Sequence, residues 1–159
     1  MNNNEQLITR FYTAFANKDY KGMQACYADN VEFSDNAFPG LKGKRAKAMW
    51  HMLIIAGKDM QLTFTNVKAN ETNGSADWTA VYSFSLTGRQ VTNHIHAEFE
   101  FQNGLIIKHS DTFDFWKWAS QAFGFKGVLL GWTSFFKKKI QTVTSQRLQS
   151  FIDKNGEYK

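Results

Sequence analysis

The alternation of apolar and polar residues is most regular between Asn93 and Trp116. From Asn93 to Phe101 the apolar residues occupy every second position, and the positions between them carry two histidines and two glutamates. A period of two is typical of a strand with one buried face. Asn103-Gly104 marks a turn, because glycine adopts positive φ without steric cost. Leu105–Trp116 then returns as the second strand of a hairpin.

Two registers are open to this hairpin. A two-residue loop at Asn103-Gly104 would place polar residues of the second strand opposite the apolar residues of the first. A three-residue loop that starts at Gln102 pairs Phe101 with Leu105 and keeps the apolar residues together, so we expect this register. The predicted apolar face carries Ile95, Ala97, Phe99, Phe101, Leu105, Ile107, Phe113 and Phe115.

The same register places His109 and Asp111 on the apolar face. Burying an unpaired carboxylate or imidazole is costly, so such residues are either satisfied by a structural partner or used chemically. Asp35 repeats the pattern, because it falls on the apolar face of a strand predicted over Val31–Ala37. Both interpretations remain open for these three residues.

The rest of the pattern predicts an α+β fold. Helices are expected over Glu5–Asn17, Asp19–Tyr27, Gly43–Ala56 and Ser134–Ile152, and further strands over Met60–Asn70 and Ala76–Leu86. The last helix has an apolar stripe of Phe136, Ile140, Val143 and Phe151. Helices followed by a strand, a helix and a meander describe a curved antiparallel sheet wrapped around the N-terminal helices. We expect one domain over residues 1–159, with a core cone at 1–118 and a C-terminal helical extension at 119–159.

Composition narrows the functional classes. A chain of 159 residues with 43% hydrophobic content can bury one substantial core. No apolar run has transmembrane length, and the N-terminus lacks a signal-peptide pattern. Cys26 is the only cysteine and fits a reducing compartment, so we expect a cytoplasmic protein. No sequence motif suggests a metal or nucleotide, so no cofactor and no metal are expected. The net charge is +5, and Lys137–Lys139 is interpreted as a solvated helix face, without a nucleic-acid or membrane partner.

The order and spacing of several short segments resemble the nuclear-transport-factor-2-like superfamily, in its SnoaL-like and ketosteroid-isomerase-like branch. The matching segments are Phe11–Asp19, Tyr27–Phe33, Gly40–Gly43, Phe101–Ile106 and His109–Asp111. The resemblance implies a cone of the cystatin-like type and a homodimer with a deep apolar pocket in each subunit. The tail that contains Leu129–Trp132 looks like an extension found in a bacterial subset of the superfamily.

The resemblance also implies site residues. Asp35 would lie where ketosteroid isomerases keep their general base, and Asp111 near the acid/base aspartate of SnoaL-like polyketide cyclases. The residues expected to line the pocket are Phe11, Phe15, Phe33, Trp50, Tyr82, Asn93, Ile95, Ala97, Phe99 and Phe113.

Two departures from the family pattern limit the reaction. Phe11 and Ala97 stand where a ketosteroid isomerase has the Tyr and Asp of its oxyanion hole, a pair that serves as a standard example of pKa tuning. This argues against a strict ketosteroid isomerase. Relatives that hydrolyse limonene epoxide need an arginine between two acids in the pocket. No arginine here falls on the inward face of the hairpin, which argues against that reaction too.

Three hypotheses follow, because one fold hosts many functions. In the first, Asp111 with His109, and Asp35 as the second acid/base group, move protons on a hydrophobic carbonyl compound, as an isomerase, a polyketide-cyclase-like enzyme or a hydratase. Asn93 and Tyr82 are candidate hydrogen-bond donors. In the second, the pocket binds a lipophilic ligand without turnover. In the third, the protein is a dimeric scaffold that uses the outer face of its sheet.

Overall fold

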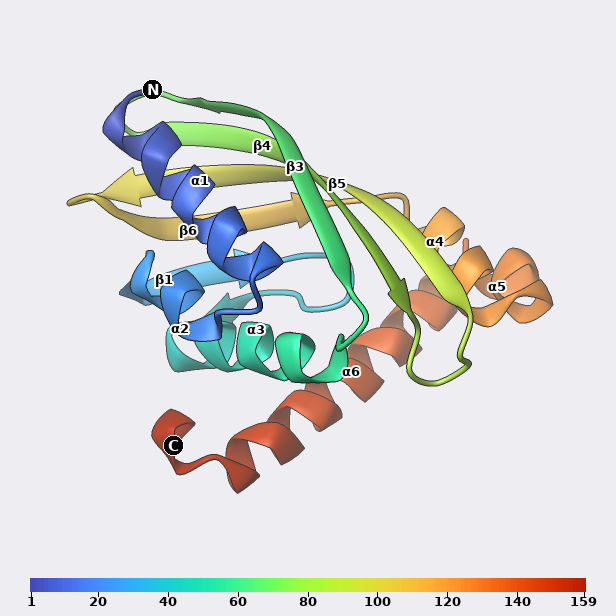
Figure 1. Cartoon of the computed structure of the whole chain (residues 1–159). Helices are drawn as coiled ribbons and strands as arrows, with labels where there is room; N and C mark the ends of the chain where they lie inside the picture. Colours follow the sequence, from blue (N-terminus) through green and yellow to red (C-terminus); the bar gives the residue numbers. More distant parts are fainter.

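The computed structural model describes all residues from 1 to 159 as an α+β fold with one curved, open sheet (Figure 1). The strand order is β2-β1-β6-β5-β4-β3; β1 and β6 are parallel, and the other neighbours are antiparallel. The elements are α1 Asn3–Ala16, α2 Tyr20–Ala25, β1 Tyr27–Ser34, β2 Leu41–Lys42, α3 Lys44–Ala56, β3 Gln61–Ala69, β4 Asn73–Ser83, β5 Gln90–Gln102, β6 Leu105–Thr112, α4 Phe115–Phe123, α5 Phe125–Leu130, α6 Ser134–Lys154 and η1 Gly156–Tyr158. The predicted fold class is confirmed.

Helix α1 lies across the concave face of the sheet (Figure 1). It begins with a capping box, in which the Asn2 side chain accepts from the backbone of Glu5 and the Glu5 carboxylate accepts from the backbone of Asn2. Its apolar face, with Leu7, Phe11 and Phe15, is buried in the main core. Helix α3 closes this core from another side through Met49 and Trp50. These two helices and the sheet enclose the space in which the site lies.

The tip of the β5–β6 hairpin differs from the prediction. The loop has two residues, and Asn103 and Gly104 have φ of 52° and 74°, which suits the type I′ turn that matches strand twist. Gln102 pairs with Leu105, and the three-residue loop is therefore wrong. The extra residue lies inside β6 as a bulge at Ile107, after which Glu100 faces Lys108.

This bulge shifts the alternation by one residue. Ile106 is buried at the tip of the hairpin, whereas Leu105 and Ile107 are only half-buried. Beyond the bulge, Phe99 faces His109 and Ala97 faces Asp111, on the inner face of the sheet. The faces predicted for His109 and Asp111 are thus those observed, although the predicted register that led to them is not.

Strand β1 starts and ends earlier than predicted. It runs from Tyr27, which was assigned to a helix, and stops at Ser34. The stop has a local cause, because the Asp35 carboxylate accepts hydrogen bonds from the backbone N–H groups of Ala37 (2.7 Å) and Phe38 (2.6 Å). Such a turn competes with the sheet ladder, so Asp35 lies just beyond the strand instead of within it.

The hairpin strand expected to reach Trp116 also ends early, at Thr112. The Asp114 side chain accepts from the backbone N–H of Lys117 and so caps α4.

Helix α6 lies beneath α3 and packs against it (Figure 1). Phe136 and Ile140 of its predicted stripe are buried. Val143 and Phe151 are half-buried, and the prediction missed the buried Leu148 and Ile152. No helix is both long and apolar enough to cross a membrane.

Candidate functional site

A cavity of about 520 Å³ lies between the sheet, α3 and α6. Most of its lining is apolar, and two carboxylates, Asp35 and Asp111, are part of that lining. Six of the residues expected from sequence line it: Phe15, Trp50, Tyr82, Asn93, Ile95 and Phe113. The other four, Phe11, Phe33, Ala97 and Phe99, are buried in the core and do not line it. The volume is in the range of small-molecule pockets.

Asp35 is the carboxylate whose charge is most affected by its surroundings. Burial raises its pKa to about 6, and the nearby charge of Asp111 acts in the same direction. The backbone N–H groups of Ala37 and Phe38 lower the pKa and so oppose this shift, because both donate to Oδ1. Oδ2 has no partner in the protein. Asp35 therefore titrates near neutral pH with one oxygen free for a ligand.

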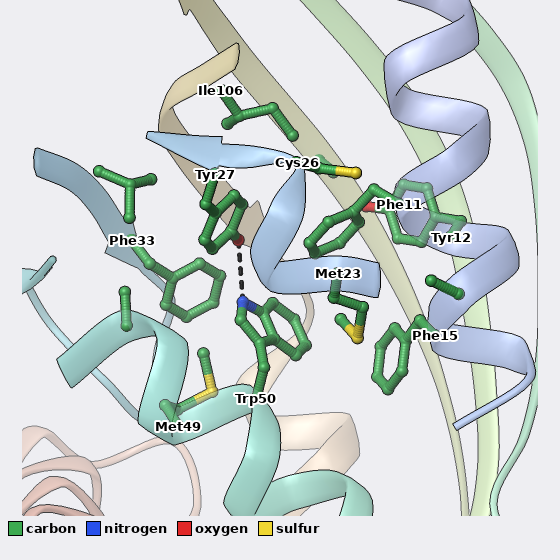
Figure 2. Packing of buried hydrophobic residues seen from close by; sticks show 14 of the residues in the cluster. Phe11, Tyr12, Phe15, Met23, Cys26, Tyr27, Phe33, Met49, Trp50 and Ile106 are labelled. Atoms are coloured by element: carbon green, nitrogen blue, oxygen red, sulfur yellow. Dashed lines mark hydrogen bonds between the residues drawn. The ribbon is translucent and has the colours of Figure 1, made fainter. Parts of the chain in front are cut away.

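Asp111 ends a chain of buried hydrogen bonds. The indole N–H of Trp50 donates to the Tyr27 hydroxyl (2.8 Å), as Figure 2 shows. The Tyr27 oxygen lies 2.7 Å from Nδ1 of His109, and His109 Nε2 lies 2.9 Å from Oδ1 of Asp111. Trp78 Nε1 donates to the same Asp111 oxygen at 3.4 Å. The chain thus links α3, β1 and β6 to the carboxylate.

The donor and acceptor roles along this chain of hydrogen bonds follow from the groups at its ends. Trp50 can only donate, so the Tyr27 oxygen accepts, and the Tyr27 hydrogen is left to donate to His109 Nδ1. Burial also raises the pKa of Tyr27 well above its ordinary value, which keeps the hydroxyl protonated. His109 Nε2 then carries the remaining proton and donates to Asp111.

His109 itself does not reach the cavity. Its side chain is fully buried between the rings of Phe99, Phe33 and Trp50, at centroid distances of 4.4, 5.1 and 5.8 Å. Asp111, two residues further along β6, lines the cavity and has no partner at Oδ2. The sequence-predicted site residues thus divide into two carboxylates at the cavity and one histidine behind it.

Sequence reasoning missed several residues of the site. Tyr27 reaches His109 through the parallel pairing of β1 with β6, and no local pattern signals a contact between residues about 80 positions apart. Trp118 donates to the Tyr82 hydroxyl (2.9 Å) from α4. Helix α6 forms one cavity wall with Ile140, Val143 and Arg147. Arg147 thus shares the cavity lining with the two carboxylates, and the sequence-based argument against an epoxide-hydrolase reaction, which expected no arginine in the pocket, is wrong. The amphipathic stripe of α6 was the available signal, because Ile140 and Val143 belong to it.

Two further observations complete the site. No group of three or more His, Cys, Asp and Glu side chains is placed to hold a metal ion. Tyr12 is fully buried near Trp78 and Phe99, and its hydroxyl has no hydrogen-bond partner. Burial raises the pKa of this hydroxyl well above its ordinary value, so it stays neutral.

Comparison with known proteins agrees with this fold. Residues 8–109 match the family described as the SnoaL-like domain. No curated protein matches the chain. A candidate polyketide cyclase from Xanthomonas campestris is 21% identical, over 74% of this chain and 94% of that chain, with a TM-score of 0.62. An NTF2-like protein of unknown function from Burkholderia pseudomallei is also 21% identical, over 72% and 92%, with a TM-score of 0.61.

A third similar structure is an LEH-like epoxide hydrolase from M. tuberculosis. It is 17% identical, over 84% of this chain and 95% of that chain, with a TM-score of 0.60. At these identities the three structures show that the fold is shared, and nothing finer about chemistry.

Proposed function

The chain belongs to the SnoaL-like domain family, and we propose that its cavity catalyses cofactor-independent proton transfer on a hydrophobic carbonyl compound. The observation that supports this most is the pair of carboxylates, Asp35 and Asp111, in one apolar cavity. A general base is most effective when its pKa lies near the working pH, and burial raises the pKa of Asp35 to about 6.

In the proposed reaction Asp35 removes a proton from the carbon next to the carbonyl group. The C–H bond breaks, an O–H bond forms at Asp35 Oδ2, and the substrate becomes an enolate. Return of the proton from Asp35 to another carbon completes an isomerisation. Alternatively, the enolate carbon attacks a second carbonyl group, whose C=O π bond opens to an alkoxide, and the alkoxide takes the proton back from Asp35 to complete an aldol-type cyclisation. The apolar walls keep water from competing for the proton.

The enolate oxygen needs hydrogen-bond donors. Tyr82 fits this role, because its oxygen accepts from Trp118 and its own hydrogen is left free toward the cavity. Burial raises the pKa of Tyr82, which keeps that hydrogen in place. Asn93 lines the same cavity and can supply an amide N–H.

Asp111 is the second acid/base group in this proposal. Its Oδ1 is held by His109 and Trp78, so its Oδ2 has a set direction toward the cavity. His109 and Tyr27 are positioning residues, because they act on the ligand only through Asp111.

The experiment follows exchange of α-protons for solvent deuterium by NMR, in a panel of hydrophobic ketones and 1,3-dicarbonyl compounds. Wild-type protein should accelerate exchange for at least one compound, and Asp111→Asn and Asp35→Asn should each slow it by roughly 100-fold or more. Circular dichroism controls for the fold of each variant. Tight binding of a panel member without exchange would instead support the second candidate, a lipophilic-ligand-binding module, which the apolar lining also favours.

We also propose that the protein forms a homodimer through the outer face of the sheet. Exposed polar side chains on that face are already paired across strands, as in the 2.7 Å contact of His96 with Asp77 and the 2.9 Å contact of His94 with Thr79. Sedimentation velocity at micromolar concentration should show a dimer. A monomer at that concentration would contradict the proposal.

A further inference from the structure

A cluster of large apolar side chains stands exposed at one end of the molecule, where α4 and α5 project beyond the sheet (Figure 1). We call this cluster the apolar tip. Its members are Trp116, Phe125, Val128, Leu129, Leu130, Trp132 and Phe135. Phe125, Trp132 and Phe135 are each about three-quarters exposed. The other exposed large apolar residues, Met1, Ile55 and Leu86, lie far apart in the sequence. Scattered apolar residues are normal on a surface, but a cluster indicates an interaction site.

Helix α5 is attached in a way that turns its apolar residues outward. Its one buried residue is Gly127, which packs so closely on the Ala119 carbonyl that a side chain would overlap it. Phe125, Val128 and Leu129 follow the i, i+3, i+4 spacing of one helical face. That face has no partner within the chain.

The backbone of α5 is satisfied without water at its C-terminal end. The last four carbonyl groups of a helix lack partners in the helix itself. Here Gly127 accepts from Gly131 (2.8 Å), and Val128 accepts from the Trp116 indole (3.1 Å). Leu129 accepts from the Trp132 indole (2.9 Å). Leu130 accepts from the backbone (2.9 Å) and the hydroxyl (2.6 Å) of Thr133.

This arrangement is what an apolar medium requires. Backbone and indole groups that enter lipid must find partners inside the protein, because no water is present to replace them. The carbonyls at the end of α5 and the indole N–H groups of Trp116 and Trp132 satisfy one another. The tip can therefore leave water without stranding these polar groups.

The charged residues of the segment that contains the tip are all basic, although the exposed Asp114 precedes Trp116 as the N-cap of α4. Residues 115–152 contain six of the 19 basic residues and none of the 14 acidic ones, so the rest of the chain carries 13 basic and 14 acidic side chains. The basic residues are Lys117, Lys126, Lys137, Lys138, Lys139 and Arg147. None of them takes part in an ion pair. An apolar surface flanked mainly by basic residues fits an anionic partner.

We propose that the apolar tip inserts into the surface of an anionic lipid bilayer, with the lysines against the headgroups. A second copy of the chain fits less well, because pairing two tips would bring two sets of lysines together. Nucleic acid fits less well too. The rings of Phe125, Trp132 and Phe135 could stack on bases, but the aliphatic surface of Val128, Leu129 and Leu130 has no use in stacking. The observation that no helix could span a membrane does not concern binding at a membrane surface. The proposal thus replaces the sequence-based expectation of no membrane partner and goes beyond the proposed function.

The test is co-sedimentation of the full chain with vesicles of phosphatidylcholine alone or mixed with phosphatidylglycerol. The protein should bind the anionic vesicles at least roughly tenfold more tightly, and added salt should weaken this binding. Leu129→Ser and Trp132→Ser should each reduce binding. The controls Ile55→Ser and Leu86→Ser change apolar residues outside the tip that are about as exposed as Leu129, and they should leave binding unchanged. Lys126→Gln should weaken binding roughly fivefold.

Melting curves for every variant separate loss of binding from loss of fold, and brominated lipids should quench tryptophan fluorescence of the wild-type protein. Failure of the wild-type protein to bind anionic vesicles would overturn the proposal. Equal loss in the control variants would overturn it as well. A wild-type oligomer that Leu129→Ser or Trp132→Ser dissociates, without vesicle binding, would assign the tip to a second copy instead.

Discussion

At the residue scale, two buried tyrosines on the same core differ in what their hydroxyl groups touch. The Tyr27 hydroxyl joins Trp50 to His109, whereas the Tyr12 hydroxyl has no partner. Tyr27→Phe should lower the free energy of unfolding by about 1–3 kcal/mol, because it strands a buried donor and a buried acceptor. Tyr12→Phe should change it by less than about 0.5 kcal/mol, or raise it. Urea denaturation of both variants measures the difference, and equal losses would contradict the assigned hydrogen-bond chain.

Asp35 gives a second prediction at this scale, on pH dependence. Folding raises its pKa from 3.8 to about 6, so the folded state holds the proton more tightly than the unfolded chain. The free energy of unfolding is therefore reduced at high pH. This reduction is absent when the pH is below the pKa of the unfolded chain, grows as the pH rises from about 4 to about 6, and then stays at about 3 kcal/mol. Asp35→Asn keeps an oxygen acceptor for the turn and removes the titration.

The free energy of unfolding of Asp35→Asn, minus that of the wild-type protein, should therefore increase by about 2 to 2.5 kcal/mol between pH 4 and pH 7. Urea titrations at several pH values give this difference directly. A difference that does not vary with pH would show that Asp35 is not buried as a carboxylate.

At the element scale, the contact of α5 with α4 depends on one glycine. Ala is normally about 1 kcal/mol better than Gly in a helix, so Gly127→Ala would stabilise a free helix. Here the added carbon overlaps the Ala119 carbonyl, and we expect a loss of about 1–3 kcal/mol. Gly156→Ala is the control, because nothing lies within 4 Å of its new carbon. Thermal melts compare the two variants, and a stabilised Gly127→Ala protein would contradict the packing of α5.

The elements also show what sequence could and could not predict. Strand alternation gave the hairpin and the inward faces of His109 and Asp111, because burial of one sheet face is a local property. The bulge at Ile107 was missed, because without a bulge a two-residue loop at Asn103-Gly104 places polar residues opposite apolar ones, so the pattern favoured the three-residue loop. The start of β1 at Tyr27 was missed too, because its parallel partner Ile106 is remote in sequence.

At the scale of the whole molecule, the cavity depends on parts that come together only in three dimensions. The family resemblance pointed to Asp35 and Asp111, and both line the cavity. It did not indicate that α6 supplies a wall through Ile140 and Arg147, because the amphipathic stripe of α6 predicts a buried face but not the cavity that this face borders. Composition could not reveal the apolar tip either, because an apolar segment in the sequence is equally typical of a buried core.

The pH profile of α-proton exchange tests the central claim most directly. With Asp35 as the base, the exchange rate of the wild-type protein at low substrate concentration should rise tenfold per pH unit below about 6 and level off above it. Asp35→Asn should lose this profile while the fold remains. A wild-type rate that does not vary between pH 4 and pH 8, or an unchanged profile in Asp35→Asn, would contradict the assignment of the cavity as an acid/base site.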